Sequence, residues 1–358
     1  MDFSITADQR LMQESLARTL ETAAPLDRVR AFAADREPIA RDLWAALADF
    51  GLPGVVIPEE HGGLGLGLLD AALAAEVLGR AVAPSPFLGS VAASVALVRG
   101  GSGEQQARWL PKIASGEVVV GLAISEAVAG ARDGMGVTAS GGKLSGGALF
   151  VTDALAADLF LVADTAGGLH LVAGDAAGLS RSDVTSIDLT RRLGELAFDG
   201  VAAEPLAAHA LDAVRDAAWT LLAADTLGAA EVMIEKAVAY AKERRQFGRV
   251  IGSFQAVKHL CAEMAAELEP SRSLVWYAAY AFDDAPAEAG LTAAHAKAHT
   301  SEIGRFIART ATEVHGGMGI TDLLGLHYWF KRIGLNRQLL GGPERVRRIA
   351  ARMQGLAA

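Results

Sequence analysis

The chain has 358 residues, 51% of them apolar, and carries a formal net charge of -9. This acidic balance argues against a nucleic-acid partner, because a phosphate backbone requires a basic footprint on the protein. Cys261 is the single cysteine, which excludes disulfides within the chain and zinc sites built from several cysteines.

Length and hydropathy favour a protein of roughly two or three domains without a membrane anchor. No uninterrupted apolar run reaches the roughly 18 residues that a membrane span requires, so we expect no transmembrane helix. The first ten residues, MDFSITADQR, lack the basic and apolar regions of a signal peptide. We therefore expect a cytoplasmic protein.

Residues 1–117 predict an N-terminal α-helical domain. Thr6 followed three residues later by Gln9 is the pattern of a capping box, and apolar residues then recur every fourth residue as far as Leu20. Prolines and glycines separate the helical patterns that follow. Further helices are expected around residues 39–50, 69–82 and 87–99.

Residues 118–205 predict a small antiparallel β-domain. Short runs rich in Val, Leu and Phe alternate there with glycine and Asp/Ser turns, which is the texture of hairpin-connected strands. The expected strands lie in VVVGLAIS, KLSGGALFVT, DLFLVAD, LHLVAG and LGELAFDGV.

Residues 206–358 predict a C-terminal four-helix bundle with longer helices, so that the whole chain has an α+β fold. One helix is expected from about residue 212 to Arg245 and a second from a cap at Ser253 to about Phe282. A third should span about 288–314 and stop at Gly316 and Gly317.

Two motifs invite functional interpretations that their context does not favour. HGGLGLG at 61–67 lacks the GxGxxG spacing and a preceding strand, so an inter-helix loop is favoured over a dinucleotide site. His295 and His299 have the i, i+4 spacing of zinc ligands, but the acid that a hydrolytic zinc helix places after its first histidine is missing. We expect no metal site.

The stretch ERRQFGRVIGSFQAVKH, residues 243–259, is more specific. Arg244, Arg245 and Arg249 gather where one long helix ends and the next begins, and Phe247 could stack on a flat ring. Such a cluster can bind a pyrophosphate, although arginines at a helix end are also favoured by the helix dipole.

This stretch resembles the flavin-contacting segment of the acyl-CoA dehydrogenase family. Other segments resemble the family in the same order along nearly the whole chain, which makes a chance likeness improbable: MDFSITADQR, VIPEEHGGLGLG, EQQARWLPKIASGE, LGELAFDGV and EVHGGMGITDLLGLHYWFKR. The resemblance implies a helical domain, a small β-domain and a second helical domain, in agreement with the predicted elements.

The resemblance also implies a reaction and its partners. In the family, a carboxylate removes the α-proton of an acyl-CoA thioester while hydride leaves the β-carbon for FAD, and an electron-transferring flavoprotein takes the electrons. A desolvated carboxylate with a raised pKa suits this proton transfer. In the family, FAD is shared across a subunit interface.

Each half of the flavin site has its own set of matching positions. Arg244, Phe247 and Gln255 match residues that reach the ADP half of the neighbouring subunit's FAD, and EVHGGMG contributes Glu313, Gly316 and Gly317 to cofactor binding. Glu313 stands where the family usually has glutamine. An extra negative charge beside a pyrophosphate is unfavourable unless a cation such as Arg244 neutralises it.

The half that faces the isoalloxazine ring departs further from the family. Ser125 keeps a hydroxyl in AISEAVAGARD, but Ala131 and Arg132 replace the serine and aspartate of the family's T-E-x-x-x-G-S-D pattern. Phe150 and Thr152 match the aromatic residue that packs on the ring and the threonine that bonds to it.

The catalytic base is absent from both positions that the family uses. Gly341 aligns with the usual glutamate and Pro343 with a flavin-contacting threonine, and the alternative position on the long helix falls on Ala218. Two weak candidates for a displaced base remain. Asp216 lies roughly 200° around the helix from Ala218, and Glu344 lies three residues beyond Gly341.

The sequence therefore predicts a companion subunit that completes the FAD site of a catalytic paralogue in an α2β2 heterotetramer. The resemblance is to the heteromeric acyl-CoA dehydrogenases of bacterial steroid side-chain degradation, and the substrate would be a bulky CoA ester. Two alternatives remain open. The first is an active homotetramer with a displaced base, either Asp216 or Glu344, or a flavoenzyme of related but different chemistry on a CoA thioester. The second is a structural or ligand-binding paralogue without flavin.

Overall fold

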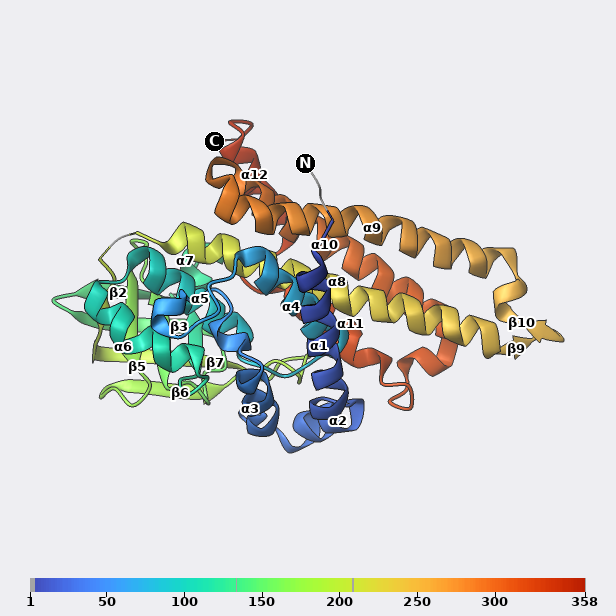
Figure 1. Cartoon of the computed structure of the whole chain (residues 1–358), viewed down its shortest axis with the longest axis horizontal. Coiled ribbons are helices and arrows are strands. Elements are labelled where there is room, and N and C mark those ends of the chain that lie inside the picture. Colours follow the sequence, from blue (N-terminus) through green and yellow to red (C-terminus); the bar gives the residue numbers. More distant parts are fainter. Residues whose placement is uncertain (1–3, 133, 208, 358) are drawn as a thin grey trace.

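The computed structural model describes residues 4–132, 134–207 and 209–357. Met1 to Phe3 of the expected opening segment, and Asp133 of the ring-side segment, lie outside the described residues. The chain forms a helical N-terminal part, a central sheet and a helical C-terminal part in that order, as the sequence predicts. Figure 1 shows the sheet at one end of the molecule and a long helical bundle reaching away from it.

In the part of the chain that the structure describes, six α-helices form the N-terminal part. Its first helix begins with the expected capping box: Thr6 Oγ1 accepts from the Gln9 amide at 3.1 Å, and Gln9 Oε1 accepts from the Thr6 amide at 3.0 Å. The α-helices are α1 (Ala7–Ala23), α2 (Leu26–Asp35), α3 (Arg41–Asp49), α4 (Leu68–Arg80), α5 (Phe87–Gly100) and α6 (Gly103–Ala114), with the 3-10 turns η1 (Leu52–Gly54) and η2 (Glu59–His61) between α3 and α4.

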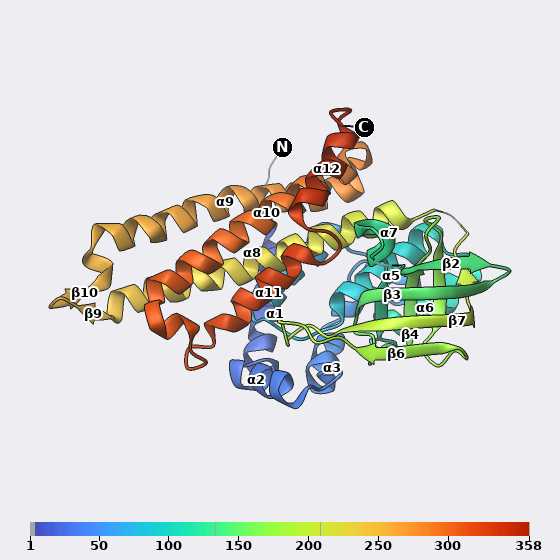
Figure 2. The same ribbon diagram turned by 180° about the vertical axis from the view of Figure 1, so that it is seen from behind.

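The middle part is one sheet with the strand order β6-β7-β3-β1-β4-β5-β8, and β2 pairs with β3. Figure 2 shows its strands from the side opposite to Figure 1. Its elements are β1 (Val120–Ala123), α7 (Ser125–Ala129), β2 (Gly136–Ser140), β3 (Lys143–Thr152), β4 (Leu159–Ala163), β5 (Leu169–Ala173), β6 (Leu179–Asp183), β7 (Leu193–Ala202) and β8 (Glu204–Pro205).

The expectation of a purely antiparallel sheet is wrong for one pair, because β1 and β4 run parallel. A parallel pair needs a long crossover, and residues 124–158 provide one that contains α7 and the β2–β3 hairpin. The other pairs are antiparallel.

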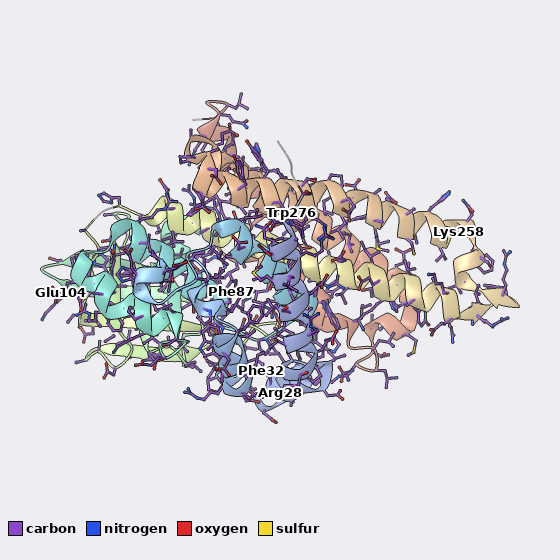
Figure 3. All side chains as sticks on the ribbon, in the orientation of Figure 1. Arg28, Phe32, Phe87, Glu104, Lys258 and Trp276 are labelled. Atoms are coloured by element: carbon purple, nitrogen blue, oxygen red, sulfur yellow. The ribbon has the colours of Figure 1, made fainter. Side chains whose placement is uncertain are left out.

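The C-terminal part contains α8 (Leu211–Glu243), the hairpin β9 (Arg245–Gln246) and β10 (Arg249–Val250), the turn η3 (Ile251–Ser253), α9 (Gln255–Asp284), α10 (Pro286–His315), the turn η4 (Gly316–Ile320), α11 (Leu326–Gln338) and α12 (Pro343–Met353). Figure 3 places Lys258 near the hairpin end of α9 and Trp276 further along it, where Trp276 Nε1 donates to Glu76 of α4 at 3.3 Å.

The predicted cap of α9 is wrong. Ser253 Oγ donates to the Val250 carbonyl at 2.7 Å, and α9 begins after Phe254 without a side-chain cap. Ser253 belongs instead to the η3 turn, which folds back so that the Ile251 amide donates to the Arg244 carbonyl at 2.8 Å. The helix is held by packing rather than by a cap.

The helix α8 forms the centre of the molecule. It packs against α4 and α5 of the N-terminal part and against α9, α10 and α11 of the C-terminal part. It is long and apolar enough to span a membrane by composition, but 94% of its most apolar window is buried inside the protein. We therefore describe α8 as the core helix of the bundle.

Candidate functional site

A cavity of about 590 Å³ lies where the sheet meets the C-terminal helices. It is lined by α7 and the segment after it, by β3, by residues 184–186 and by the turn between α11 and α12. The resemblance assigns isoalloxazine-ring and catalytic-base positions to α7, β3 and this turn. The structure thus brings Ser125, Phe150 and Gly341 together at one cavity.

The turn at Gly341 has a backbone that favours glycine. Its φ is +109° and that of the preceding Leu340 is +57°, both in the left-handed range. A Cβ built on Gly341 would meet only ordinary contacts at 3.6 to 4.0 Å, so space does not exclude a side chain there. The backbone conformation is therefore what disfavours a residue with a side chain at Gly341.

Two buried donors hold this turn in place. Trp219 Nε1 on α8 donates to the Leu340 carbonyl at 2.8 Å. Lys297 Nζ on α10 donates to the carbonyls of Asn336 at 2.6 Å and Arg337 at 3.1 Å, and lies 3.4 Å from the carbonyl oxygen of Gly341. Lys297 therefore caps the end of α11 from a neighbouring helix.

Of the two weak candidates for a displaced base, only Glu344 lines the cavity. Its side chain is 69% exposed, and Oε1 pairs with Arg337 Nη2 at 3.2 Å. Asp216 lies outside the cavity lining and pairs with Arg215 at 2.8 Å. Burial raises the pKa of Asp216 to about 6, against the opposing charge of Arg215. Ala218 is fully buried in α8.

Sequence reasoning gave no role to a third carboxylate, Glu126 on α7, which also lines the cavity. Its Oε1 accepts from the Leu149 amide at 2.8 Å. Burial raises the pKa of Glu126, while the bond from Leu149 and the charge of Arg132 oppose that rise. The sequence feature that could have identified Glu126 is its place in the T-E-x-x-x-G-S-D pattern, where this sequence keeps the glutamate.

The aromatic residue of the ring half sits at a distortion of β3. Phe150 has a φ of +56°, and the pairing of β3 with β7 shifts register between Ala148 and Val151. This β-bulge turns the Phe150 ring toward the cavity that it lines. The Arg132 guanidinium lies over the same ring, 5.4 Å from its centroid.

Two hydroxyls among the predicted ring-side residues have no hydrogen-bond partner among the described residues. Ser125 Oγ and Thr152 Oγ1 are both buried, and Ser125 lines the cavity. A buried hydroxyl without a partner costs free energy. Such atoms often mark the place of a ligand or water.

The predicted ADP-binding residues lie at the opposite end of the bundle (Figure 1). Arg244 ends α8, Phe247 occupies the hairpin with 91% of its surface exposed, and Gln255 begins α9. Phe247 has a φ of +54° and packs edge-on against Phe254. Gln255 Nε2 lies 2.9 Å from His259 Nε2. These side chains face outward rather than toward the cavity of their own chain.

The remaining predicted cofactor residues share that end of the bundle. Glu313, Gly316 and Gly317 are exposed where α10 passes into η4. The ring of His315 stacks on Tyr240 of α8 at a centroid distance of 4.7 Å, which holds the end of α10 beside the end of α8. Of the residues that the structure describes, none other than neighbours in the chain comes within 4 Å of a Cβ built on Gly316 or Gly317.

Among the described residues no group of three or more potential metal ligands is present. His295 and His299 lie on α10, and His295 Nε2 is 3.3 Å from Gln354 Nε2. The loop at 61–67 contains the end of η2 and leads into α4, and no strand precedes it within residues 4–60. It is therefore the inter-helix loop that the sequence favours.

Comparison with known proteins agrees with this architecture. Residues 6–117 match the model of the acyl-CoA dehydrogenase N-terminal domain and residues 209–354 that of the acyl-CoA dehydrogenase C-terminal domain. The acyl-CoA dehydrogenase IpdE2 of Mycobacterium tuberculosis is 33% identical over 95% of this chain and 95% of its own.

Two solved structures are similar over almost their whole length. The Tcur3481-Tcur3483 steroid ACAD G363A variant has a TM-score of 0.89 and 31% identity, covering 97% of this chain and 98% of that one. The ChsE4-ChsE5 complex of Mycobacterium tuberculosis has a TM-score of 0.90 and 26% identity, covering both chains fully.

Proposed function

We propose that this chain, which belongs to the acyl-CoA dehydrogenase family, is the companion subunit of a heteromeric member of that family. In this role it supplies Arg244, Phe247 and Gln255 to FAD bound mainly by a catalytic paralogue, and it does not remove the α-proton itself. The observation that supports the proposal is the turn at Gly341, where a left-handed backbone stands at the position that the resemblance assigns to the family's base.

The ADP half of an FAD fits the exposed end of the bundle. Arg244 offers a cation and α9 offers its first backbone N–H groups, a combination that suits a pyrophosphate. The exposed Phe247 ring can stack on a flat ring of the cofactor. Because these groups point away from their own cavity, they suit a cofactor held by a neighbouring subunit. FAD bound there supplies the hydride acceptor of the reaction.

The ring half of this chain fits a flavin less well than the ADP half does. The hydroxyls of Ser125 and Thr152 are free to bond to one. The face of Phe150, however, is covered by Arg132, which stands where the family has an aspartate. We therefore derive no catalytic step at this chain's own cavity. The substrate of the assembly would be a bulky CoA ester, an assignment supported by the steroid enzyme among the similar structures.

The proposed assembly is an α2β2 heterotetramer in the cytoplasm that passes its electrons to an electron-transferring flavoprotein. A similar structure described as a complex of two proteins supports the heteromeric form. Removing the general base typically costs a homomer 10² to 10⁴-fold in rate, so one subunit without it needs a partner that has it.

One observation favours a second candidate, an active homotetramer. Glu344 lines the cavity and could act as a displaced base. Its high exposure and its pairing with Arg337 weaken this candidate, because a base for this reaction gains from desolvation. The third candidate, a flavin-free structural paralogue, leaves the exposed Phe247 unexplained.

The variant Arg244→Ala, made in this chain and purified with the paralogue, tests the proposal. Because Arg244 is exposed at the end of α8, we expect the pair to fold and to lose most of its flavin absorbance near 450 nm, on the order of tenfold. Arg10→Ala, an exposed arginine on α1, is the matched control and should leave the flavin content unchanged. Full flavin content in the Arg244 variant would contradict the proposal.

A further inference from the structure

The cavity beside Gly341 has a volume of about 590 Å³, although no base lines it at the family's position. Three arginines line it, Arg132, Arg345 and Arg348, and none of them pairs with a carboxylate among the described residues. Arg345 donates to the Val128 carbonyl at 3.3 Å and packs flat against Gly130, where a Cβ would lie 2.9 Å from Nη1. Its charge is thus held at the cavity without an anion.

Among the described residues, the carboxylates that line the cavity form no salt bridge with these arginines, although the charge of Arg132 acts on Glu126. Glu126 is engaged by the Leu149 amide, and Glu344 pairs with Arg337. The N-terminus of α12, which begins at the cavity with Gly342 as its cap, adds the positive end of a helix dipole. The charge that faces the cavity is therefore predominantly positive, and it suits an anion.

Ser125 provides an independent sign of a ligand. Its residue is 6% exposed, its Oγ has no partner among the described residues, and it lines the cavity. The hydroxyl can donate one hydrogen bond and accept two. An acceptor atom bound in the cavity would remove the free-energy cost of leaving it unpaired.

The rest of the lining combines the polar side chains of Thr185, Ser186 and Gln338 with an apolar group. Leu193 at the start of β7, Leu335 on α11 and Leu339 in the following turn contribute side chains, and Val184 adds another from the segment before β7. A volume of about 590 Å³ lies within the range of roughly 300–1,000 Å³ typical of sites for drug-sized ligands. The cavity can therefore hold a large apolar body joined to an anionic group.

We propose that this cavity is a flavin-free binding site for an organic carboxylate with a large apolar body, such as a long-chain or fused-ring acid. Ser125 Oγ and the guanidinium groups of Arg132 and Arg345 bind the carboxylate, and the leucines enclose the apolar body. The inference rests on the proposed function, because a chain that held a flavin ring against Phe150 would leave no room for this ligand. The cavity then binds the free acid rather than the thioester.

Isothermal titration calorimetry on the full-length chain tests the site with laurate and cholate as probes. We expect one site per chain, with loss of binding for the methyl esters of both acids. Arg345→Ala should weaken binding by about 10 to 100-fold, the value of a charge-assisted hydrogen bond, and Ser125→Ala by about 3 to 10-fold. Arg347→Ala is the matched control on the same helix, since Arg347 does not line the cavity, and should bind normally.

Several results would overturn the proposal: absence of binding, equal binding of the methyl esters, or binding of lauroyl-CoA without binding of laurate. Insensitivity to both Arg345→Ala and Ser125→Ala would do the same. If Arg345→Ala fails to fold, Arg132→Ala, which removes an exposed side chain, takes its place. The flavin content of the pair separates the two proposals: half occupancy without acid binding rejects this inference alone, whereas a flavin in every chain rejects both.

Discussion

At the scale of single residues, the turn at Gly341 depends on a buried amine. Lys297 is 1% exposed, and its Nζ bonds to the last carbonyls of α11. Burial lowers the pKa of Lys297 to about 7, and the nearby charge of Arg337 acts in the same direction. The neutral amine still donates hydrogen bonds, so Lys297 can hold the turn without a buried charge.

We predict that Lys297→Met destabilises the protein and that the loss grows with pH. Since the folded pKa is about 7 and the reference value is 10.5, the unfolded chain holds the proton between these values and the folded chain releases it. The stability that Lys297 contributes should therefore rise from pH 7 toward pH 10. Above pH 8 the variant should lose about 1–3 kcal/mol, because carbonyls remain without a donor.

Urea unfolding of both proteins at pH 7, 8 and 9 measures this difference. Lys143→Met, which removes an exposed lysine at the start of β3, controls for the loss of a surface charge. A difference between wild type and Lys297→Met that stays flat or shrinks as the pH rises would contradict the argument.

At the scale of elements, α4 and α8 approach each other through glycines. A Cβ on Gly228 of α8 would overlap the Glu76 carbonyl of α4, and a Cβ on Gly79 of α4 would overlap the Asp225 carbonyl of α8. Neither glycine has a positive φ, so close approach of the two backbones is the reason for both. The helices of the N-terminal part are thereby locked onto the core helix.

Gly228→Ala should destabilise the protein by about 1–3 kcal/mol, since even one methyl group forces the two helices apart. Gly334→Ala is the matched control: it lies in α11 and a Cβ there meets nothing within 4 Å. That variant should be neutral or more stable, because alanine favours a helix over glycine. Thermal unfolding of both variants checks the pair, and equal effects would refute the close-packing argument.

The helices and strands differ in how well the sequence predicts them. Long helices were predicted within a few residues of their ends, as for α8 and α10. The strands β2 and β6 were missed because GVTAS and LSRSD are polar and lack a run of large apolar residues. The parallel pairing of β1 with β4 could not be predicted, because pairing between distant strands leaves no local pattern.

Only part of the candidate site could be predicted from the sequence. Family resemblance located Gly341, Ser125 and Phe150, which the structure brings to one cavity. The left-handed backbone of Phe150 and the cover by Arg132 follow from a β-bulge and a side-chain contact that no spacing rule detects. Helix position alone did not show that Asp216 lies outside the cavity, since that depends on how α8 packs.

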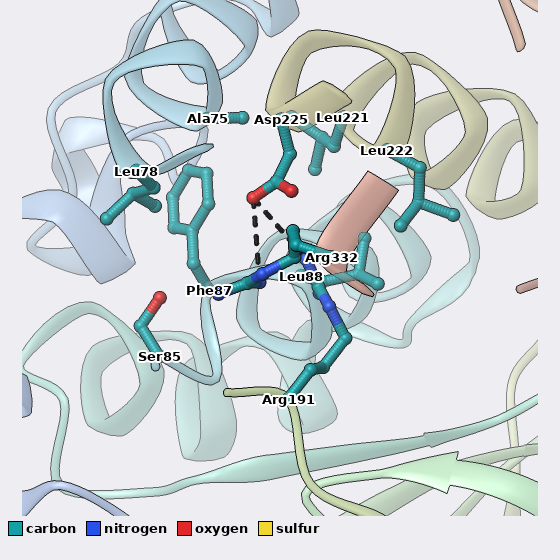
Figure 4. Close-up of a pocket in the computed structure, with 10 residues that line it drawn as sticks. All are labelled: Ala75, Leu78, Ser85, Phe87, Leu88, Arg191, Leu221, Leu222, Asp225 and Arg332. Carbon is teal, nitrogen blue, oxygen red and sulfur yellow. Dashed lines mark ion pairs between the residues drawn. The ribbon is translucent and has the colours of Figure 1, made fainter. Parts of the chain in front are cut away.

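At the scale of the whole molecule, a buried ionic cluster joins the three parts of the chain (Figure 4). Asp225 of α8 pairs with Arg191, which precedes β7, at 3.4 Å and with Arg332 of α11 at 3.6 Å. Asn336 Nδ2 donates to Asp225 at 2.5 Å, and Arg332 donates to the Ala83 carbonyl before α5 at 2.8 Å. An adjoining cavity of about 20 Å³ has room for one water that could bond to the remaining polar atoms.

Asp225→Asn should be strongly destabilising, by roughly 3–5 kcal/mol, because it leaves two buried arginines with one fewer negative partner. Asp212→Asn on the same helix is the control, since the Asp212 side chain is 83% exposed and its pair with Arg215 lies at the surface. Chemical denaturation measures both variants. A loss below 1 kcal/mol for Asp225→Asn would mean that the cluster does not hold the three parts together.

The most direct test of the companion role is the visible absorption spectrum and native mass of this chain, purified alone and then together with its paralogue. The account predicts a colourless protein alone and a yellow heterotetramer with about half a flavin per chain in the pair. A yellow homotetramer, whose flavin bleaches on adding an acyl-CoA, would contradict the account and would make Glu344 the first residue to substitute.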